Sequence, residues 1–238
     1  MKYLVDTHTH TIASGHAYNT IDEMTRHAGE IGLKSIAITE HAPEMPGTCH
    51  LFYFNNLHVV PRDKFGVHRL MGREANIINH DGKIDLGPET LKNLDIVIAS
   101  FHTPCIKPGT VEENTAALLK VMDNPFVNII GHPDDSRYAV DMQQVVSGVK
   151  KSHTLLELNN TSLKPHGPRK GARENDLRML ELCKKNNVCI TLGSDAHVEE
   201  DIANFKYAQV LLDMVDFPDR LIANTDLDLL DSYLSKAR

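Results

Sequence analysis

Near the N-terminus, the stretch Tyr3-Leu4-Val5-Asp6-Thr7-His8-Thr9-His10 joins a short apolar run directly to two histidines in alternate positions. A short apolar run that ends in polar residues is consistent with a buried parallel strand. In an extended chain, His8 and His10 point to the same side, so their imidazoles can share one metal ion. The stretch therefore predicts a strand whose carboxyl end carries a metal site.

Further apolar runs of strand length follow along the chain, and amphipathic helical patterns separate most of them. The predicted strands are 3–5, 35–39, 69–72, 96–100, 128–130, 155–158 and 189–192. Capping boxes formed by Thr20 with Glu23 and by Thr110 with Glu113 start the first two helices. The predicted helices are 21–31, 111–122, 142–151, 174–185, 202–214 and 227–234.

Strands that alternate with helices predict a parallel sheet covered by helices. Seven such units in 238 residues predict an α/β protein, a single-domain distorted (βα)7 TIM-like barrel over residues 1–238. An open doubly wound sheet is the alternative, but no glycine-rich phosphate turn follows the first strand. The stretch 42–66 is too long for an ordinary connection, so we expect it to form a lid or loop over the site.

The formal net charge of -7 argues against a general nucleic-acid or membrane-surface binder. The four cysteines show no CxxC spacing, which suits a reducing compartment. The first apolar run ends at Asp6, too early for a secretory signal, and no stretch approaches the ~20 apolar residues of a membrane span. We therefore expect a cytoplasmic protein that binds neither membranes nor extended nucleic acid, and the oligomeric state stays open.

Histidine is unusually abundant, with 14 residues, and metal-binding side chains follow nearly every predicted strand. These strand-end residues are His8, His10, His41, Glu74, His102, His132, Asp195 and His197. In a (βα) barrel the carboxyl ends of the strands meet at one mouth, so these side chains would face the same space. With His16 in the loop after His10, the candidate ligands exceed the set of one ion and imply two or three ions of Zn²⁺, Mn²⁺ or Fe²⁺.

Other histidines and one cysteine are interpreted without a role in chemistry. His27, His58, His68, His80 and His153 match no strand end. His50 lies in the predicted lid, and Cys105 is interpreted as a small loop or buried thiol that binds no metal.

Six short motifs are distributed over essentially the whole chain. They are Asp6-Thr7-His8-Thr9-His10, Ile38-Thr39-Glu40-His41, Gly72-Arg73-Glu74-Ala75-Asn76, Phe101-His102, Gly131-His132-Pro133 and Gly193-Ser194-Asp195-Ala196-His197. Together they resemble the motifs of the PHP (polymerase and histidinol phosphatase) superfamily. Within it, the chain is most similar to YcdX-type phosphatases through Ala17-Tyr18, Glu74-Ala75-Asn76-Ile77 and Glu157-Leu158-Asn159-Asn160-Thr161-Ser162.

The resemblance implies a distorted (βα)7 barrel with a trinuclear metal centre, with Zn²⁺ as the expected ion and Mn²⁺ or Fe²⁺ as alternatives. One ion would be held by His8, His10, Glu74 and Asp195, a second by Glu74, His102 and His132, and a third by His16, His41 and His197. Glu74, Asp195 and His197 would be the catalytic residues.

Three positions depart from the family pattern. Glu40 stands where Asp is more frequent, and Ala42 stands where Gly is usual. Arg73, beside Glu74, is bulkier and more polar than expected, and should point outward because strand neighbours alternate.

Two or three cations can neutralise a phosphate and lower the pKa of a bound water toward ~7. The expected function is therefore a phosphoesterase, and more narrowly a phosphomonoesterase, that uses a metal-activated hydroxide on a small phosphorylated substrate. Cations in the loop 164–170 would bind the anionic part of the substrate. The expected substrate contacts are Asn159, Lys164, Arg169 and Lys170.

Two other functions remain open on the sequence. Amidohydrolase-type barrels also begin with HxH and end with a strand-end Asp. A catalytically silent metal-binding regulatory module would keep the ligands without turnover.

Overall fold

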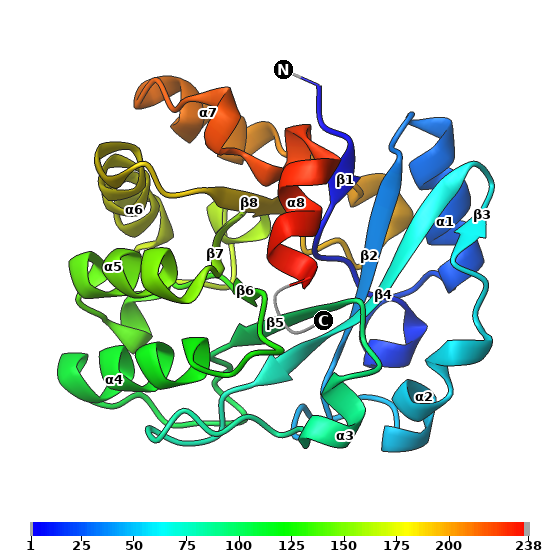
Figure 1. The fold of residues 1–238 in the computed structure, drawn as a ribbon, viewed down its shortest axis with the longest axis horizontal. Helices are drawn as coiled ribbons and strands as arrows, with labels where there is room; N and C mark the ends of the chain where they lie inside the picture. The colour runs from blue at the N-terminus through cyan, green and yellow to red at the C-terminus, as the bar shows by residue number, and fades with distance from the viewer. Residues whose placement is uncertain (1, 236–238) are drawn as a thin grey trace.

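The computed structural model describes residues 2–235, in which a parallel sheet curls into an almost closed barrel with helices around it (Figure 1). The strands are β1 (Val5–Asp6), β2 (Ser35–His41), β3 (Asp63–Lys64), β4 (Val67–Asn76), β5 (Ile96–Ser100), β6 (Ile129–Ile130), β7 (Leu155–Asn159) and β8 (Ile190–Gly193). The helices are α1 (Ile21–Glu30), α2 (Leu51–Asn55), α3 (Pro88–Leu91), α4 (Val111–Met122), α5 (Met142–Ser152), α6 (Ala172–Asn186), α7 (Lys206–Met214) and α8 (Leu227–Leu234). The predicted distorted barrel is confirmed.

Parallel pairing runs in the order β1-β2-β4-β5-β6-β7-β8, while β3 pairs with β4 in antiparallel fashion. The segments that follow β8 and β1 close the barrel. The amide of Asp195 donates to the carbonyl of His8 at 2.9 Å, and the amide of His10 donates to the carbonyl of Ala196 at 2.9 Å. The barrel seam therefore consists of the segments that carry the first and last predicted ligands.

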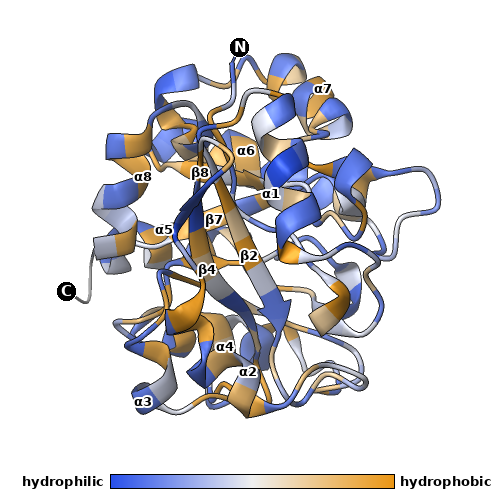
Figure 2. Cartoon of the chain, turned by 90° about the vertical axis from the view of Figure 1, so that its right-hand side faces the viewer, coloured by the Kyte–Doolittle hydropathy of each residue, from blue (hydrophilic) through white to orange (hydrophobic). Residues whose placement is uncertain are grey.

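Alternate strand residues face the barrel interior and the surrounding helices. On β2, Ala37 belongs to the inner cluster of apolar side chains, whereas Ile36 and Ile38 pack outward. Helix α8 lies across the middle of the barrel in Figure 1, and its Leu230 and Leu234 belong to the inner cluster. Strands β2 and β4 change from hydrophobic to hydrophilic at their C-terminal ends (Figure 2), so the polar site lies at the mouth opposite α8.

Part of the stretch 42–66, for which we predicted a lid or loop, forms regular structure. It contains α2, a 3₁₀ helix (Leu57–Val59) and β3. Phe54 of α2 is buried, and the guanidinium carbon of Arg73 lies 3.0 Å from the centre of its ring. This segment thus covers the outer face of β4, toward which Arg73 points as predicted. Its helices escaped prediction because they are too short to show a helical period.

Smaller differences concern the ends of elements. Helix α3 was not predicted, and β4 extends well beyond the predicted 69–72. The predicted helix 202–214 begins at Lys206, because a 3₁₀ turn and a left-handed Ala203, with φ of 52°, precede it.

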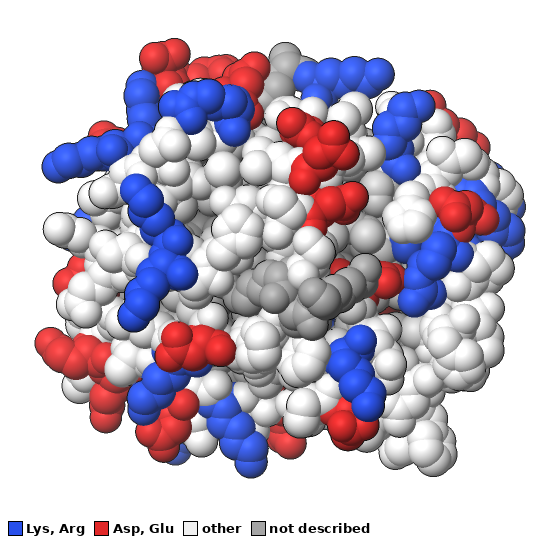
Figure 3. All heavy atoms as spheres, in the orientation of Figure 1, with Lys and Arg blue, Asp and Glu red and all other residues white. Residues whose placement is uncertain are grey.

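Acidic and basic side chains are interspersed on the face shown in Figure 3, so neither sign dominates that side of the molecule. Within residues 2–235, none of the helices has the length and apolar character that a membrane span requires.

Candidate metal centre

The carboxylate of Glu74, on the inner side of β4, lies at the centre of the barrel mouth. Its Oε2 lies 2.8 Å from His41 Nδ1 and 3.4 Å from His8 Nε2. Its Oε1 lies 3.0 Å from His102 Nε2 and 2.8 Å from His132 Nε2. The two oxygens of this carboxylate therefore face different sets of imidazoles.

A second carboxylate, from Asp195, joins the group around His8 and His10. The Nε2 atoms of His8 and His10 lie 3.0 Å apart. Asp195 Oδ1 lies 3.7 Å from the first and 3.3 Å from the second. His10 Nε2 is also 3.6 Å from Glu74 Oε2, so four side chains assigned to one ion lie together.

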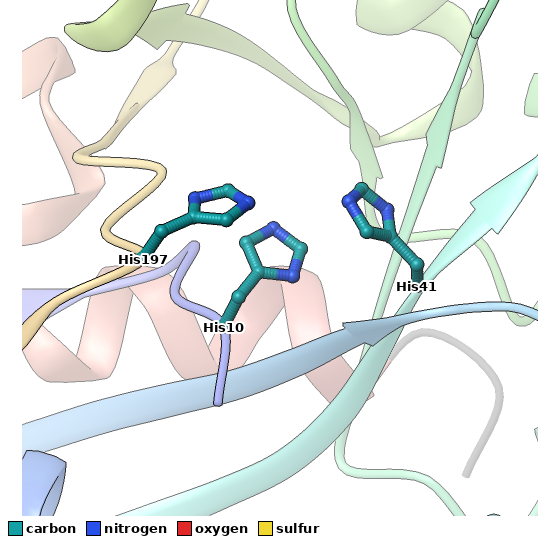
Figure 4. A group of neighbouring side chains, drawn as sticks. All are labelled: His10, His41 and His197. Atoms are coloured by element: carbon teal, nitrogen blue, oxygen red, sulfur yellow. The ribbon is translucent and has the colours of Figure 1, made fainter. Parts of the chain in front are cut away.

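A third group contains the imidazoles of His16, His41 and His197. The ring centre of His16 lies 5.0 Å from that of His41 and 4.8 Å from that of His197. Figure 4 shows His10, His41 and His197 turned toward one another, and one ligand atom of each lies within 4.8 Å of the others. His41 also lies within this distance of Glu74 and His102, so the groups form one continuous cluster.

Several atoms of the cluster are buried without a hydrogen-bond partner, namely His41 Nδ1, Glu74 Oε2 and His102 Nε2. His41 Nδ1 lies 2.8 Å from Glu74 Oε2, and His102 Nε2 lies 3.0 Å from Glu74 Oε1. Leaving buried polar atoms unpaired is costly, and a cation between them would satisfy them. Imidazole nitrogens and carboxylate oxygens suit Zn²⁺, Mn²⁺ or Fe²⁺, so the donor set fits such ions.

Backbone strain occurs at two of these positions. His132 has φ of 29° and Asp195 has φ of 55°, values that residues other than glycine seldom adopt. The amide of His132 donates to Glu157 Oε2 at 2.8 Å, and the amide of Asp195 donates to the carbonyl of His8 at 2.9 Å. These hydrogen bonds hold the two strained turns.

Electrostatics keeps Glu74, His10 and His102 in the form that binds metal. Burial by itself would raise the pKa of Glu74, but the imidazoles of His102 and His8 hold it well below its usual value. Burial lowers the pKa of His10 well below its usual value and that of His102 to about 4. His8 differs: burial would lower its pKa, but carboxylates, led by Glu157, raise it well above its usual value. Ionised carboxylates and neutral imidazoles are the metal-binding states.

Glu157 is a site residue that the sequence analysis missed. It is fully buried, and its Oε1 lies 2.6 Å from His8 Nδ1. The alternation of side chains along a strand could have identified Glu157 in the sequence, because Leu155, Glu157 and Asn159 share the inner side of β7. A carboxylate on the inner side of a buried strand needs a partner, and here it has an imidazole.

Two of the expected substrate contacts, Arg169 and Asn159, lie at the cluster. The guanidinium of Arg169 donates to Asp195 Oδ2 at 3.2 Å, to Asn159 Oδ1 at 3.1 Å and to Ser162 Oγ at 2.9 Å. The amide of Asn159 donates to Asp195 Oδ2 at 3.3 Å. Asn159 is thus engaged with Arg169 and Asp195.

The other two expected contacts lie elsewhere. The ammonium of Lys164 pairs with Asp201 at 2.8 Å. Lys170 is exposed, and its backbone carbonyl accepts from the amide of Ser136 at 2.8 Å. Of the cationic loop, Arg169 is therefore the residue that reaches Asp195.

The side chains that were assigned no chemical role have other surroundings. His27 pairs with Glu30, His58 with the carbonyl of Asn55, His68 with Asp63, and His153 with the carbonyl of Ser232. His50 caps α2, and Nε2 of His80 has no hydrogen-bond partner. Burial raises the pKa of the Cys105 thiol to about 12, which disfavours the thiolate that a metal would need.

Four similarities to known proteins bear on this site. The model of the family described as "PHP domain" matches residues 6–161. A probable phosphatase of Clostridium novyi is 50% identical over 98% of this chain and 95% of its own length. A probable phosphatase of Clostridium acetobutylicum is 47% identical over 98% of this chain and 95% of its own length. The crystal structure of histidinol phosphate phosphatase from Lactococcus lactis, complexed with Zn, L-histidinol and phosphate, is similar in fold. The TM-score is 0.65, the sequence identity is 19%, and the match covers 91% of this chain and 95% of that chain.

Proposed function

This chain belongs to the PHP domain family, and from that membership we propose that it is a phosphomonoesterase with a trinuclear metal centre. It is a hydrolase of the phosphatase class, the class for which its relatives are named. The observation that carries the finer proposal is the position of Glu74, whose two oxygens face imidazoles from β2 and from the segment after β5. A carboxylate so placed can bridge two ions. We also propose that residues 1–238 form one such domain, which includes Arg169, Asp195 and His197 beyond the matched stretch.

We assign the nine donors to three ions as the family motifs imply. His8, His10, Glu74 and Asp195 would hold the first ion, Glu74, His102 and His132 would hold the second, and His16, His41 and His197 would hold the third. Zn²⁺ is the proposed ion, and Mn²⁺ or Fe²⁺ are the alternatives. Glu74, Asp195 and His197 are the proposed catalytic residues.

The chemistry divides between the bound ions and the protein. Bound divalent cations would supply positive charge for the phosphate and a water of lowered pKa. Arg169, held by Asp195, Asn159 and Ser162, has guanidinium protons to spare and is the proposed phosphate contact. Asn159 keeps that guanidinium in place, and the substrate is a small phosphorylated molecule.

The test begins with the metal content of the purified protein. Zn²⁺, Mn²⁺ and Fe²⁺ are then restored separately after chelation, and phosphomonoesters, phosphodiesters, amides and lactones are assayed. We expect close to three ions per chain and turnover of phosphomonoesters that chelation abolishes. Turnover confined to amides or lactones would assign an amidohydrolase instead, and a metal-loaded protein without turnover would indicate a regulatory module.

Glu74→Gln provides the matching variant. Removing one charge that faces both sets of imidazoles should lower kcat by about 10²–10³-fold and reduce the bound metal. Glu89→Gln, on the exposed side of α3, is the control. Normal metal content and turnover in the Glu74 variant would contradict the proposal.

A further inference from the structure

Glu40, Ser14 and His10 form a buried row of hydrogen bonds, which we call the serine relay. Ser14 Oγ donates to Glu40 Oε2 at 2.5 Å and lies 3.0 Å from His10 Nδ1. The amide of His41 donates to the same Oγ at 3.1 Å. Glu40 also accepts from the amide of Thr11 at 3.1 Å and from its hydroxyl at 2.5 Å. All of these side chains are buried.

The partners of Ser14 determine which nitrogen of His10 carries the proton. A serine hydroxyl has one proton and two lone pairs. The proton goes to the carboxylate of Glu40, and the amide of His41 uses one lone pair. Toward His10 the hydroxyl can therefore act as an acceptor, so Nδ1 of His10 must carry hydrogen. His10 Nε2 then keeps its lone pair and faces Asp195 Oδ1 at 3.3 Å.

Asp85, Asn76 and His102 form a second row, the asparagine relay. Asp85 accepts from the backbone amide of Asn76 at 2.9 Å and from its side-chain Nδ2 at 2.7 Å. The carbonyl of Ala42 also accepts from this Nδ2, at 3.2 Å. Two acceptors fix the orientation of the Asn76 amide, so its Oδ1 must face His102 Nδ1, at 2.7 Å. His102 Nδ1 therefore carries hydrogen, and Nε2 faces Glu74 Oε1 at 3.0 Å.

We propose that the serine and asparagine relays select the imidazole tautomers that leave Nε2 of His10 and His102 free for metal. Glu40 and Asp85 are then positioning residues that act through Ser14 and Asn76. A neutral imidazole can carry its proton on either nitrogen, and the wrong choice turns an N–H toward the cation. This inference rests on the proposed metal centre. Partners of this kind contribute about 10–100-fold to metal affinity.

Substitutions at Glu40 separate a hydrogen-bond role from a charge role. In Glu40→Gln the side-chain oxygen can still accept from Ser14, while its NH₂ group can face the hydroxyl of Thr11. The tautomer of His10 should therefore be retained. In Glu40→Ala the proton of Ser14 is released and can turn toward His10 Nδ1, which then becomes an acceptor. Ser14→Ala removes the fixed partner altogether.

For Asp85→Asn we expect the opposite of the result for Glu40→Gln. Asp85 accepts from two N–H groups of Asn76 through different oxygens. The amide in Asp85→Asn can accept at one of these places but turns an NH₂ group toward the other. Asp85→Asn should therefore fail to preserve the asparagine relay, unlike Glu40→Gln in the serine relay.

The experiment measures the tautomers directly in the protein of residues 1–238. Long-range ¹H–¹⁵N spectra of metal-free protein with ¹⁵N-labelled histidine report which ring nitrogen of His10 and His102 is protonated. Competition with a chelator then gives Zn²⁺ affinity. Ser35→Ala is the matched control, since Ser35 is buried on the same strand as Glu40 but donates to the carbonyl of His68.

We expect Nδ1–H at His10 in the unmodified protein, in Glu40→Gln and in Ser35→Ala. Ser14→Ala and Glu40→Ala should show the other tautomer or a mixture, with Zn²⁺ affinity about 10–100-fold lower. The native tautomer and affinity in both of these variants, or their loss in Glu40→Gln, would overturn the proposal. Failure of the proposed function looks different: the unmodified protein would bind Zn²⁺ without hydrolysing phosphate esters, while the tautomers followed the relays.

Discussion

Glu157 Oε1 lies 2.6 Å from His8 Nδ1, and both side chains are fully buried at the mouth of the barrel. The other oxygen of Glu157 accepts from the backbone amide of His132 at 2.8 Å. One carboxylate thus orients an imidazole that follows β1 and a strained turn that follows β6. This contact links two groups that the proposed function assigns to different ions.

Glu157→Gln should lower Zn²⁺ affinity or kcat by about 10–100-fold. A glutamine can accept from His8 or from the amide of His132, but it turns an NH₂ group toward the other. Metal titration and steady-state kinetics give the measurement. Glu181→Gln, exposed on α6, is the control, and equal behaviour of the two variants would contradict this role for Glu157.

Gly193→Ala should disrupt the contact between Glu157 and His8, because the added methyl group would collide with both side chains. A Cβ at Gly193 would lie 1.9 Å from Glu157 Oε1 and 2.8 Å from the Cβ of His8. The expected loss is about 1–3 kcal/mol in the free energy of unfolding, together with reduced metal binding. Gly87→Ala has no neighbouring atom within 4 Å and serves as control. Urea denaturation of both variants tests the difference, and an unaffected Gly193→Ala would show that the site can expand.

Arg169→Lys should lower kcat/KM by about 10–100-fold, because an ammonium cannot reproduce the hydrogen bonds of the guanidinium. Lys164→Met removes a cation from the same loop, but this ammonium pairs with Asp201. We therefore expect a change of less than about threefold for Lys164→Met, the size of a surface ion pair. Steady-state kinetics with one phosphomonoester compare the two variants. A larger loss of kcat/KM in Lys164→Met than in Arg169→Lys would indicate that Lys164, and not Arg169, contacts the substrate.

Asp176→Asn should stabilise the protein near neutral pH. The carboxylate oxygens of Asp176 and of neighbouring Asp134 are buried without hydrogen-bond partners. Burial and the charge of Asp134 raise the pKa of Asp176 well above its ordinary value of 3.8. At pH values below 3.8, Asp176 is mostly protonated in both the folded and unfolded states. At pH values above 3.8, Asp176 ionises in the unfolded chain before it ionises in the folded protein, so the free energy of unfolding falls as the pH rises.

Asparagine cannot ionise, so the variant should exceed the unmodified protein by about 1–3 kcal/mol at pH 7. This advantage should shrink as the pH is lowered toward 4. Urea denaturation of the metal-free proteins at several pH values gives the measurement. Asp231→Asn, exposed on α8, should change stability by less than about 0.5 kcal/mol. A pH-independent difference between Asp176→Asn and the unmodified protein would exclude ionisation as its cause.

Much of the fold followed from local signals. Short apolar runs marked each of the parallel strands, and the capping boxes at Thr20 and Thr110 are present with both of their hydrogen bonds. The stretch 42–66 could not be predicted, because α2 and β3 depend on burial of Phe54 against β4 rather than on a local period.

The candidate ligands were predictable because strand ends meet at one mouth of a parallel barrel. The side chains behind them were not. Ser14 and Asn76 are common polar residues, and their roles depend on partners, Glu40 and Asp85, brought close by folding. The loop 164–170 likewise gave no means to distinguish Arg169, which turns inward, from Lys164.

The seam of the barrel joins the beginning of the chain to a segment near its end, through His8 with Asp195 and His10 with Ala196. Chains are synthesised from the N-terminus, and early parts can begin to fold before later parts emerge. Here β1 cannot complete the seam until the segment after β8 has been synthesised, because that segment carries Asp195 and His197. A truncated or stalled chain would carry most of the histidines yet present an open, incomplete site.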